Sequence, residues 1–135
     1  MSDTLDLIKG MGDQKISRTL DLGDHDEMYR GAIFEVWVAP TGEHLQEWQE
    51  LTNRIAVELP KLAKTMTEEE QKEALAEWQS RQAAWYGKTW LNIPPEEVPQ
   101  IRDALPGVVW DWLLLQTSRM IRNYRQEKLK NSNGG

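Results

Sequence analysis

An apolar run near the end of the chain, "VVWDWLLL" from Val108 to Leu115, constrains the fold more than any other segment. On a helix its side chains cover nearly the whole circumference, and a helix that is apolar all round is usually buried. A membrane span needs roughly 20 apolar residues, so this run is too short, and it also contains Asp111. The run therefore predicts a central helix beginning at Gly107, wrapped by the other elements. Its buried stripe should hold Trp110, Leu113, Leu114 and Ile121.

The second half of the same helix is basic. Arg119, Arg122 and Arg125 are spaced by three, Lys128 continues the series, and Glu127 is the one acid from residue 119 onward. A solvated helix end, contact with an acidic protein partner, and contact with nucleic acid or an anionic membrane all fit this stripe. The whole chain carries a net charge of -6, which disfavours general nucleic-acid binding. We expect neither a nucleic-acid nor a membrane partner.

The N-terminal part predicts a β-hairpin over residues 16–39. In "AIFEVWVAP", Phe34, Val36 and Val38 share one face of a strand, and Pro40 ends it. A two-stranded hairpin alone is marginal in water, so it needs a helix or a partner strand to pack on. Residues 1–15 are polar, with little periodicity, and are interpreted as a flexible segment.

The middle of the chain predicts helices. Thr41 is a candidate N-cap, and the following apolar positions recur every three or four residues until Pro60, which should kink or end the helix near Leu59. Thr67 and Glu70 fit a capping box for the next helix, with Gly87 as its stop. A short helix follows Pro95. These elements form one α-rich domain over residues 16–130, and the tail at residues 131–135 should be disordered.

The expected fold class is mainly α, with a small N-terminal β-hairpin followed by a bundle of three longer helices and one short helix. Catalytic groups are hard to find in it. Cysteine is absent, and the histidines are His25 and His44. His25 lies among acids in "GDHDE", where one histidine in a polar turn is usually solvated, and His44 should be exposed in a first helical turn. We expect no enzyme activity, no metal and no cofactor.

Tryptophan is over-represented, with seven residues against a single Phe. A large apolar body with a polar N–H suits both a core and an interface, so both interpretations stay open. The candidate partner-binding residues are the tryptophans on predicted strands, helices and connectors, together with the basic stripe: Trp37, Trp48, Trp78, Trp85, Trp90, Arg119, Arg122 and Arg125.

Four segments together resemble the tail assembly chaperones of long-tailed bacteriophages and prophages. They are "FEVWVAP", "TGEHLQEWQEL", "WYGKTWLNIPPEEVPQIRDALPG" and "VVWDWLLLQTSRMIRNYRQEKLK". The likeness lies in size, element order and Trp-rich style. It implies a small helical protein of the host cell cytoplasm that binds the phage tape-measure protein, keeps it soluble and helps recruit tail-tube subunits. The family has no catalytic residues to carry over.

The same resemblance implies that ribosomes slip near the end of the gene, giving a longer product that contacts the tail-tube protein. Lys130 and Asn131 are compatible with a slippery codon run. An oligomer also fits the sequence. The alternative function is a structural virion protein, such as a minor tail or head–tail joining component, which the free edge of the hairpin favours. A small nucleic-acid-binding regulator is a third hypothesis, resting on the basic helix.

Overall fold

The computed structural model describes residues 3–12 and 15–134, and residues 1–2, 13–14 and 135 lie outside the description. The fold is mainly helical, with an N-terminal antiparallel hairpin followed by five helices, three of them long, as the sequence predicts. The elements in chain order are α1 (Asp3–Gly12), β1 (Ser17–Asp21), β2 (Ile33–Trp37), α2 (Gly42–Asn53), a π-helical turn η3 (Arg54–Glu58), α3 (Leu59–Ala63), α4 (Glu68–Thr89), α5 (Val98–Ala104) and α6 (Gly107–Gly134). Short 3₁₀ turns η1 (Leu22–Asp24), η2 (Glu27–Tyr29) and η4 (Pro95–Glu97) join them.

The hairpin covers one side of the core. β1 pairs with β2 in antiparallel register, with Leu20 opposite Phe34. Phe34, Val36 and Val38 are buried, which confirms the predicted inward face of β2. The other edge of β2 is covered by the segment after α4, where the Leu91 N–H donates to the Glu35 carbonyl at 2.8 Å. β1 therefore forms the outer edge of this sheet.

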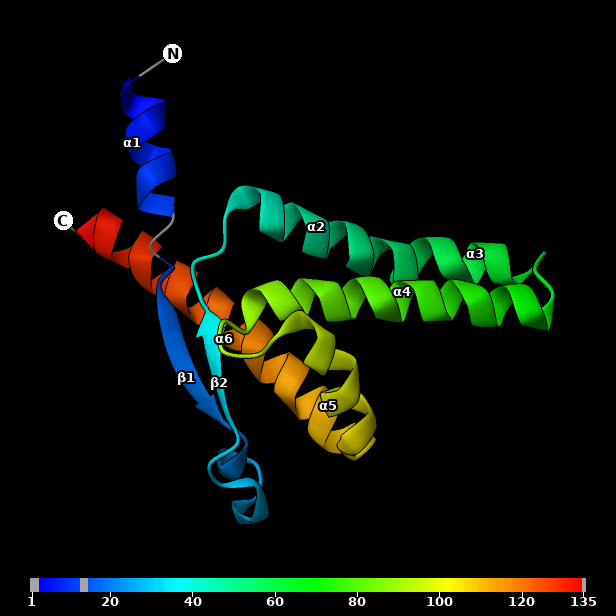
Figure 1. Cartoon of the computed structure of the whole chain (residues 1–135). Coiled ribbons are helices and arrows are strands. Elements are labelled where there is room, and N and C mark those ends of the chain that lie inside the picture. Colours follow the sequence, from blue (N-terminus) through cyan, green and yellow to red (C-terminus); the bar gives the residue numbers. More distant parts are fainter. Residues whose placement is uncertain (1–2, 13–14, 135) are drawn as a thin grey trace.

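The helices α2 and α4 form an antiparallel hairpin that projects from the rest of the protein (Figure 1). Both predicted caps are confirmed: Thr41 Oγ1 accepts the His44 N–H at 3.3 Å, and Thr67 Oγ1 accepts the Glu70 N–H at 3.2 Å. Two indoles of α4 hold the pair together, because Trp85 Nε1 donates to the His44 carbonyl at 2.7 Å. Trp78 Nε1 donates to the Leu51 carbonyl at 3.1 Å. We call this pair, with η3 and α3, the helical arm.

Pro60 bends the helical arm without ending it. Proline has no N–H, and in an α-helix its ring would meet the carbonyl four residues earlier. The chain relieves that clash by widening into η3, where the Leu59 N–H bonds to the Arg54 carbonyl, five residues back. The helical path then continues as α3. The sequence located the disturbance correctly, at Leu59, but not its form.

The long helix α6 lies at the centre of the core, as its apolar run predicts. Leu113 is fully buried, Trp110 and Ile121 are nearly so, and Leu114 is half-buried against them. β2 packs on α6, and α5 packs on α4 (Figure 1). The largest fully buried side chains come from β2, α4, the segments after α4, and α6: Trp90, Tyr86, Leu113, Val36, Val38, Val98, Thr89 and Thr117.

At three element ends the described residues continue a helix where the sequence suggested none, while residues 1–2, 13–14 and 135 of the predicted end segments lie outside the described residues. The segment predicted to be flexible contains α1, a helix of ten residues whose first turn holds Asp3 and Asp6, where acids favour the helix dipole. The segment predicted to be a disordered tail continues α6 as far as Gly134. α4 continues past Gly87 to Thr89, and a Cβ on Gly87 would lie 2.9 Å from Pro95 Cα. This glycine allows a close approach of two backbones instead.

Candidate functional site

His44 is buried between two tryptophans, contrary to the exposure that its helical position suggested. Its ring stacks on Trp85 with centroids 4.3 Å apart and faces Trp37 at 5.2 Å. The Thr89 hydroxyl donates to the Trp85 carbonyl at 2.8 Å, so its oxygen accepts the His44 Nε2–H at 2.7 Å. Burial lowers the pKa of His44 to about 4, against the opposing effect of Glu47. At neutral pH His44 is an uncharged core residue.

The candidate tryptophans divide into core and arm residues. Trp37, Trp85 and Trp90 are 8%, 3% and 0% exposed, so all three lie in the core. Trp90 Nε1 donates to Thr117 Oγ1 of α6 at 3.1 Å, which ties the end of α4 to the central helix. Trp48 and Trp78 are half-buried along the helical arm. Most of the tryptophan surplus is therefore explained by one aromatic cluster inside the protein.

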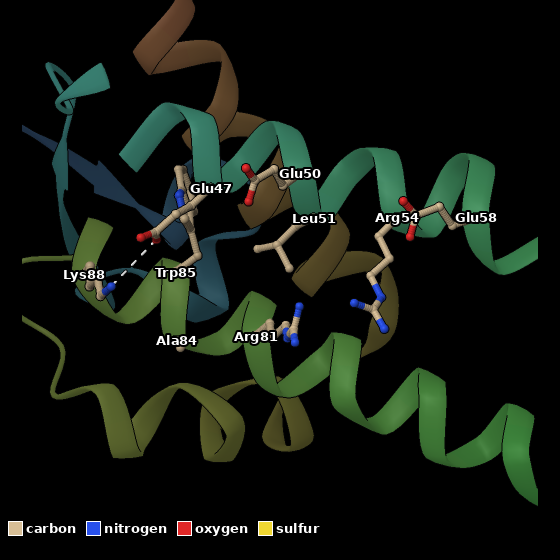
Figure 2. A pocket seen from close by; sticks show the side chains of 9 residues that line it. All are labelled: Glu47, Glu50, Leu51, Arg54, Glu58, Arg81, Ala84, Trp85 and Lys88. Atoms are coloured by element: carbon tan, nitrogen blue, oxygen red, sulfur yellow. Dashed lines mark ion pairs between the residues drawn. The ribbon is translucent and has the colours of Figure 1, made fainter. Parts of the chain in front are cut away.

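A groove of about 450 Å³ opens between α2 and α4 at the base of the helical arm. We call it the charged groove. Leu51, Ala84 and Trp85 supply its apolar surface, and its charged lining comes from both helices and from η3: Glu47, Glu50, Arg54, Glu58, Arg81 and Lys88. Figure 2 shows the Arg54 side chain extending from η3 toward α4, with Leu51 between α2 and α4. The groove thus combines an apolar floor with a rim of both signs.

The charges on this rim are only partly satisfied by one another. Lys88 Nζ lies 3.7 Å from Glu47 Oε2, the ion pair marked in Figure 2. Arg81 pairs at 2.8 Å with Glu77, one turn away on the same helix. Both pairs are exposed, so each stabilises the fold little. Their side chains can therefore be redirected to a bound partner at low cost.

A second groove, of about 310 Å³, lies where the β2–α2 connection meets the C-terminal half of α6. We call it the basic groove. Its apolar surface comes from both elements, and Arg125 and Lys128 lie on its α6 side: the lining residues are Val38, Ala39, Pro40, Leu45, Ile121, Tyr124, Arg125, Lys128 and Leu129. Glu127, the acid in this half of α6, pairs with Arg18 at 3.2 Å. Of the predicted basic stripe, Arg125 lines this groove, while Arg119 and Arg122 are exposed outside it.

The acidic loop around His25 is organised by an arginine that the sequence analysis overlooked. Arg30 lies 2.9 Å from Asp24, 2.9 Å from Glu27 and 3.4 Å from Asp21. Its guanidinium holds the pKa of Glu27 below its usual value. Over the described ranges, no three His, Asp or Glu side chains are arranged to hold a metal ion. A basic residue three positions after the last acid of this cluster was the available signal.

The grooves themselves could not be placed from sequence, although one pattern pointed to the first. Side chains of both charges recur every three or four residues on this helix, beside its apolar stripe: Glu47, Glu50, Arg54 and Glu58.

Comparison with known proteins found no similar protein: no family model, curated protein or solved structure matches the chain. Of the helices that the structure describes, none has the length and apolar character to cross a bilayer.

Proposed function

We propose that this protein is a tail assembly chaperone of a long-tailed phage or prophage, acting in the host cytoplasm, and that it holds an amphipathic helix of the tape-measure protein in the charged groove. The observation that carries the proposal is the groove itself. Its floor is formed by Leu51, Ala84 and Trp85, of which Ala84 is exposed, and charged side chains of α2, η3 and α4 surround that floor on an arm that projects from the core. Grooves of this kind bind a helix by its apolar face.

The charge arrangement favours a partner with both signs beside its apolar stripe. Glu50 and Glu58, on the α2 and η3 side, would attract lysine or arginine of a bound helix. Arg54 on the same side and Arg81 on α4 would attract its acids. A volume of about 450 Å³ admits a few side chains rather than a whole helix. Binding should therefore be shallow and reversible, which suits a holder that must later release its client to the assembling tail.

The far end of the helical arm offers more apolar surface. A third groove, of about 300 Å³, lies between α3 and α4 near the tip, and Leu59 and Leu75 are among its lining residues. Leu62 and Val57, 43% and 44% exposed, lie on the same part of the arm. A long helical client could therefore contact the arm along much of its length. Exposed apolar patches on a soluble domain often mark such interaction sites.

The test is co-expression with the tape-measure protein of the phage or prophage that encodes this chain. The full chain should move a substantial share of that protein from the insoluble to the soluble fraction, and the two should co-purify. A double variant, Arg54→Glu with Arg81→Glu, should lose most of this effect, because both groove cations become acids. Lys72→Glu provides the matched control: Lys72 is exposed on α4 and lines none of the three grooves.

An equally insoluble client with and without this chain would remove the proposed function. If the client is solubilised equally by the double variant and by Lys72→Glu, the function stands but the charged groove is not its site. Circular dichroism and thermal unfolding of each variant confirm that the fold is intact before the result is interpreted.

A structural virion component is the second candidate, and the edge strand β1 favours it. Among the residues that the structure describes, β1 has a strand partner, β2, on one side, so its outer backbone groups are placed to accept a strand from another protein. Mass spectrometry of purified particles separates the two functions. A stoichiometric amount of this chain in finished particles supports the structural role, and its absence supports the chaperone.

A further inference from the structure

α1 is an amphipathic helix with an exposed apolar face. Leu7, Ile8 and Met11 are 60%, 58% and 60% exposed, and the acids Asp3 and Asp6 lie in the first turn of the helix. In Figure 1 the helix stands away from the core. Isolated helices shorter than about 12 to 15 residues are marginal in water, and α1 has ten. Its stability therefore calls for a surface that covers the apolar face.

The basic groove has the chemistry that α1 requires. Leu45, Ile121 and Tyr124 provide an apolar surface for the apolar face of a short helix. Arg125 and Lys128 at its side match the carboxylates of Asp3 and Asp6. The charged groove is a poorer match, because three glutamates line it: Glu47, Glu50 and Glu58. Charge complementarity thus selects the basic groove for α1.

The positions of α1 and the basic groove suit exchange between two copies of the chain. The strand that follows α1 is anchored beside the groove, because the Val38 N–H donates to the Ile16 carbonyl at 3.1 Å and Val38 lines the groove. Each copy therefore carries its helix and its groove side by side. A single two-fold axis through this region would bring both helix–groove pairs together at once, as an isologous dimer requires.

We propose that two copies of this protein form a symmetric dimer in which α1 of each copy binds the basic groove of the other. This dimer buries Leu7, Ile8 and Met11 and neutralises Asp3 and Asp6 against Arg125 and Lys128. It leaves the charged groove of each copy open, so the dimer presents two helical arms. The proposal does not depend on what those arms hold.

The experiment measures the mass of the full chain by analytical ultracentrifugation across micromolar concentrations. The wild type should be a dimer. Two charge-reversed variants, Asp3→Arg with Asp6→Arg and Arg125→Glu with Lys128→Glu, should each be monomeric, with dimerisation weakened at least about tenfold. Mixed in equal amounts they should form a heterodimer, because every helix then meets a groove of opposite charge.

Two further variants make the result specific. Ile8→Asp with Met11→Asp should be monomeric and should stay so when mixed with either charge variant in equal amounts. Arg119→Glu, an exposed change on α6 outside the groove, should leave the dimer intact. A monomeric wild type overturns the proposal and points to α1 closing on its own groove. A wild-type dimer that survives both charge reversals, or a mixture that stays monomeric, overturns it equally.

Discussion

The imidazole of His44 lies parallel to the indole of Trp85, with the ring planes 3° apart. The same two residues are joined through the backbone, since Trp85 Nε1 donates to the His44 carbonyl. A ring stack and a hydrogen bond thus connect the first turn of α2 to the last turns of α4. The stack also places the one buried histidine where a proton is costly, which makes the stability of the protein sensitive to pH.

We predict that the protein loses stability as the pH falls from 6.5 toward 4. His44 binds a proton below about pH 6.5 in the unfolded chain. In the folded chain its pKa is lowered to about 4 by burial. Between these two pKa values the unfolded state holds more protons than the folded state. The free energy of unfolding therefore decreases as the pH is lowered, and at pH 5 it is about 2 kcal/mol smaller than at pH 7. Urea unfolding at pH 7 and pH 5 measures the loss.

His44→Gln removes the titrating group, so this variant should lose less stability between pH 7 and pH 5 than the wild type. His25→Gln serves as the control, because His25 is exposed in the acidic loop, and it should keep the wild-type dependence. Equal pH dependence in the wild type and in His44→Gln would show that His44 is not the group responsible.

Trp78→Phe should destabilise the protein by about 1 kcal/mol through loss of one hydrogen bond. The indole of Trp78 donates to the Leu51 carbonyl in the last turn of α2, next to η3, and phenylalanine has no donor. Hydrogen exchange should show faster opening of the amides in η3. Trp112→Phe is the matched control, because the Trp112 indole makes no hydrogen bond among the described residues. In this variant the exchange of the η3 amides should be unchanged. Equal exchange in both variants would contradict the prediction.

Three neighbouring leucines of α6 should respond differently to alanine. Leu113 is fully buried, so Leu113→Ala should cost about 2 to 5 kcal/mol through the lost contacts and the cavity. Leu114 is half-buried, so Leu114→Ala should destabilise the protein less. Leu115 is 48% exposed, so Leu115→Ala should destabilise it least. Chemical denaturation of the three variants checks the order. Loss of partner binding from Leu114→Ala, without loss of stability, would instead place its face at an interface.

Gly87→Ala should destabilise by about 1 to 3 kcal/mol, because the added Cβ meets the backbone of Pro95 at 2.9 Å and forces α4 and η4 apart. Gly42→Ala is the matched control, since a Cβ there meets nothing within 4 Å, and it should be neutral or slightly stabilising. Thermal unfolding of both variants measures the difference. A neutral Gly87→Ala would mean that the connector after α4 moves without cost.

Local signals in the sequence were sufficient for much of the fold. The apolar side chains at every second position predicted the inward face of β2. The hydroxyls of Thr41 and Thr67 predicted two helix starts, because a cap depends on residues within one turn. The central place of α6 followed from the apolar run around Leu113. Each of these inferences needs information from only a few neighbouring positions.

The remaining features depend on contacts between distant residues. His44 is buried by Trp85, which follows it by 41 positions, and no local pattern indicates that stack. The role of Gly87 depends on where Pro95 folds back, so its stop-like position was misleading. The charged groove forms where α2 and α4 diverge, and their spacing is set by packing rather than by either helix alone. Pro60 was read correctly as a disturbance because proline acts on its own backbone.

The two indole bonds of the helical arm join His44 to Trp85 and Leu51 to Trp78, so their spacing is seven residues on both helices. Sliding one helix by a single turn would break both bonds together, so the two bonds set the register of α2 against α4 as a unit. Both bonds also lie on the core side of the tip. Residues gained or lost around Thr65 would change the reach of the arm without altering its attachment, so evolution can adjust the two separately.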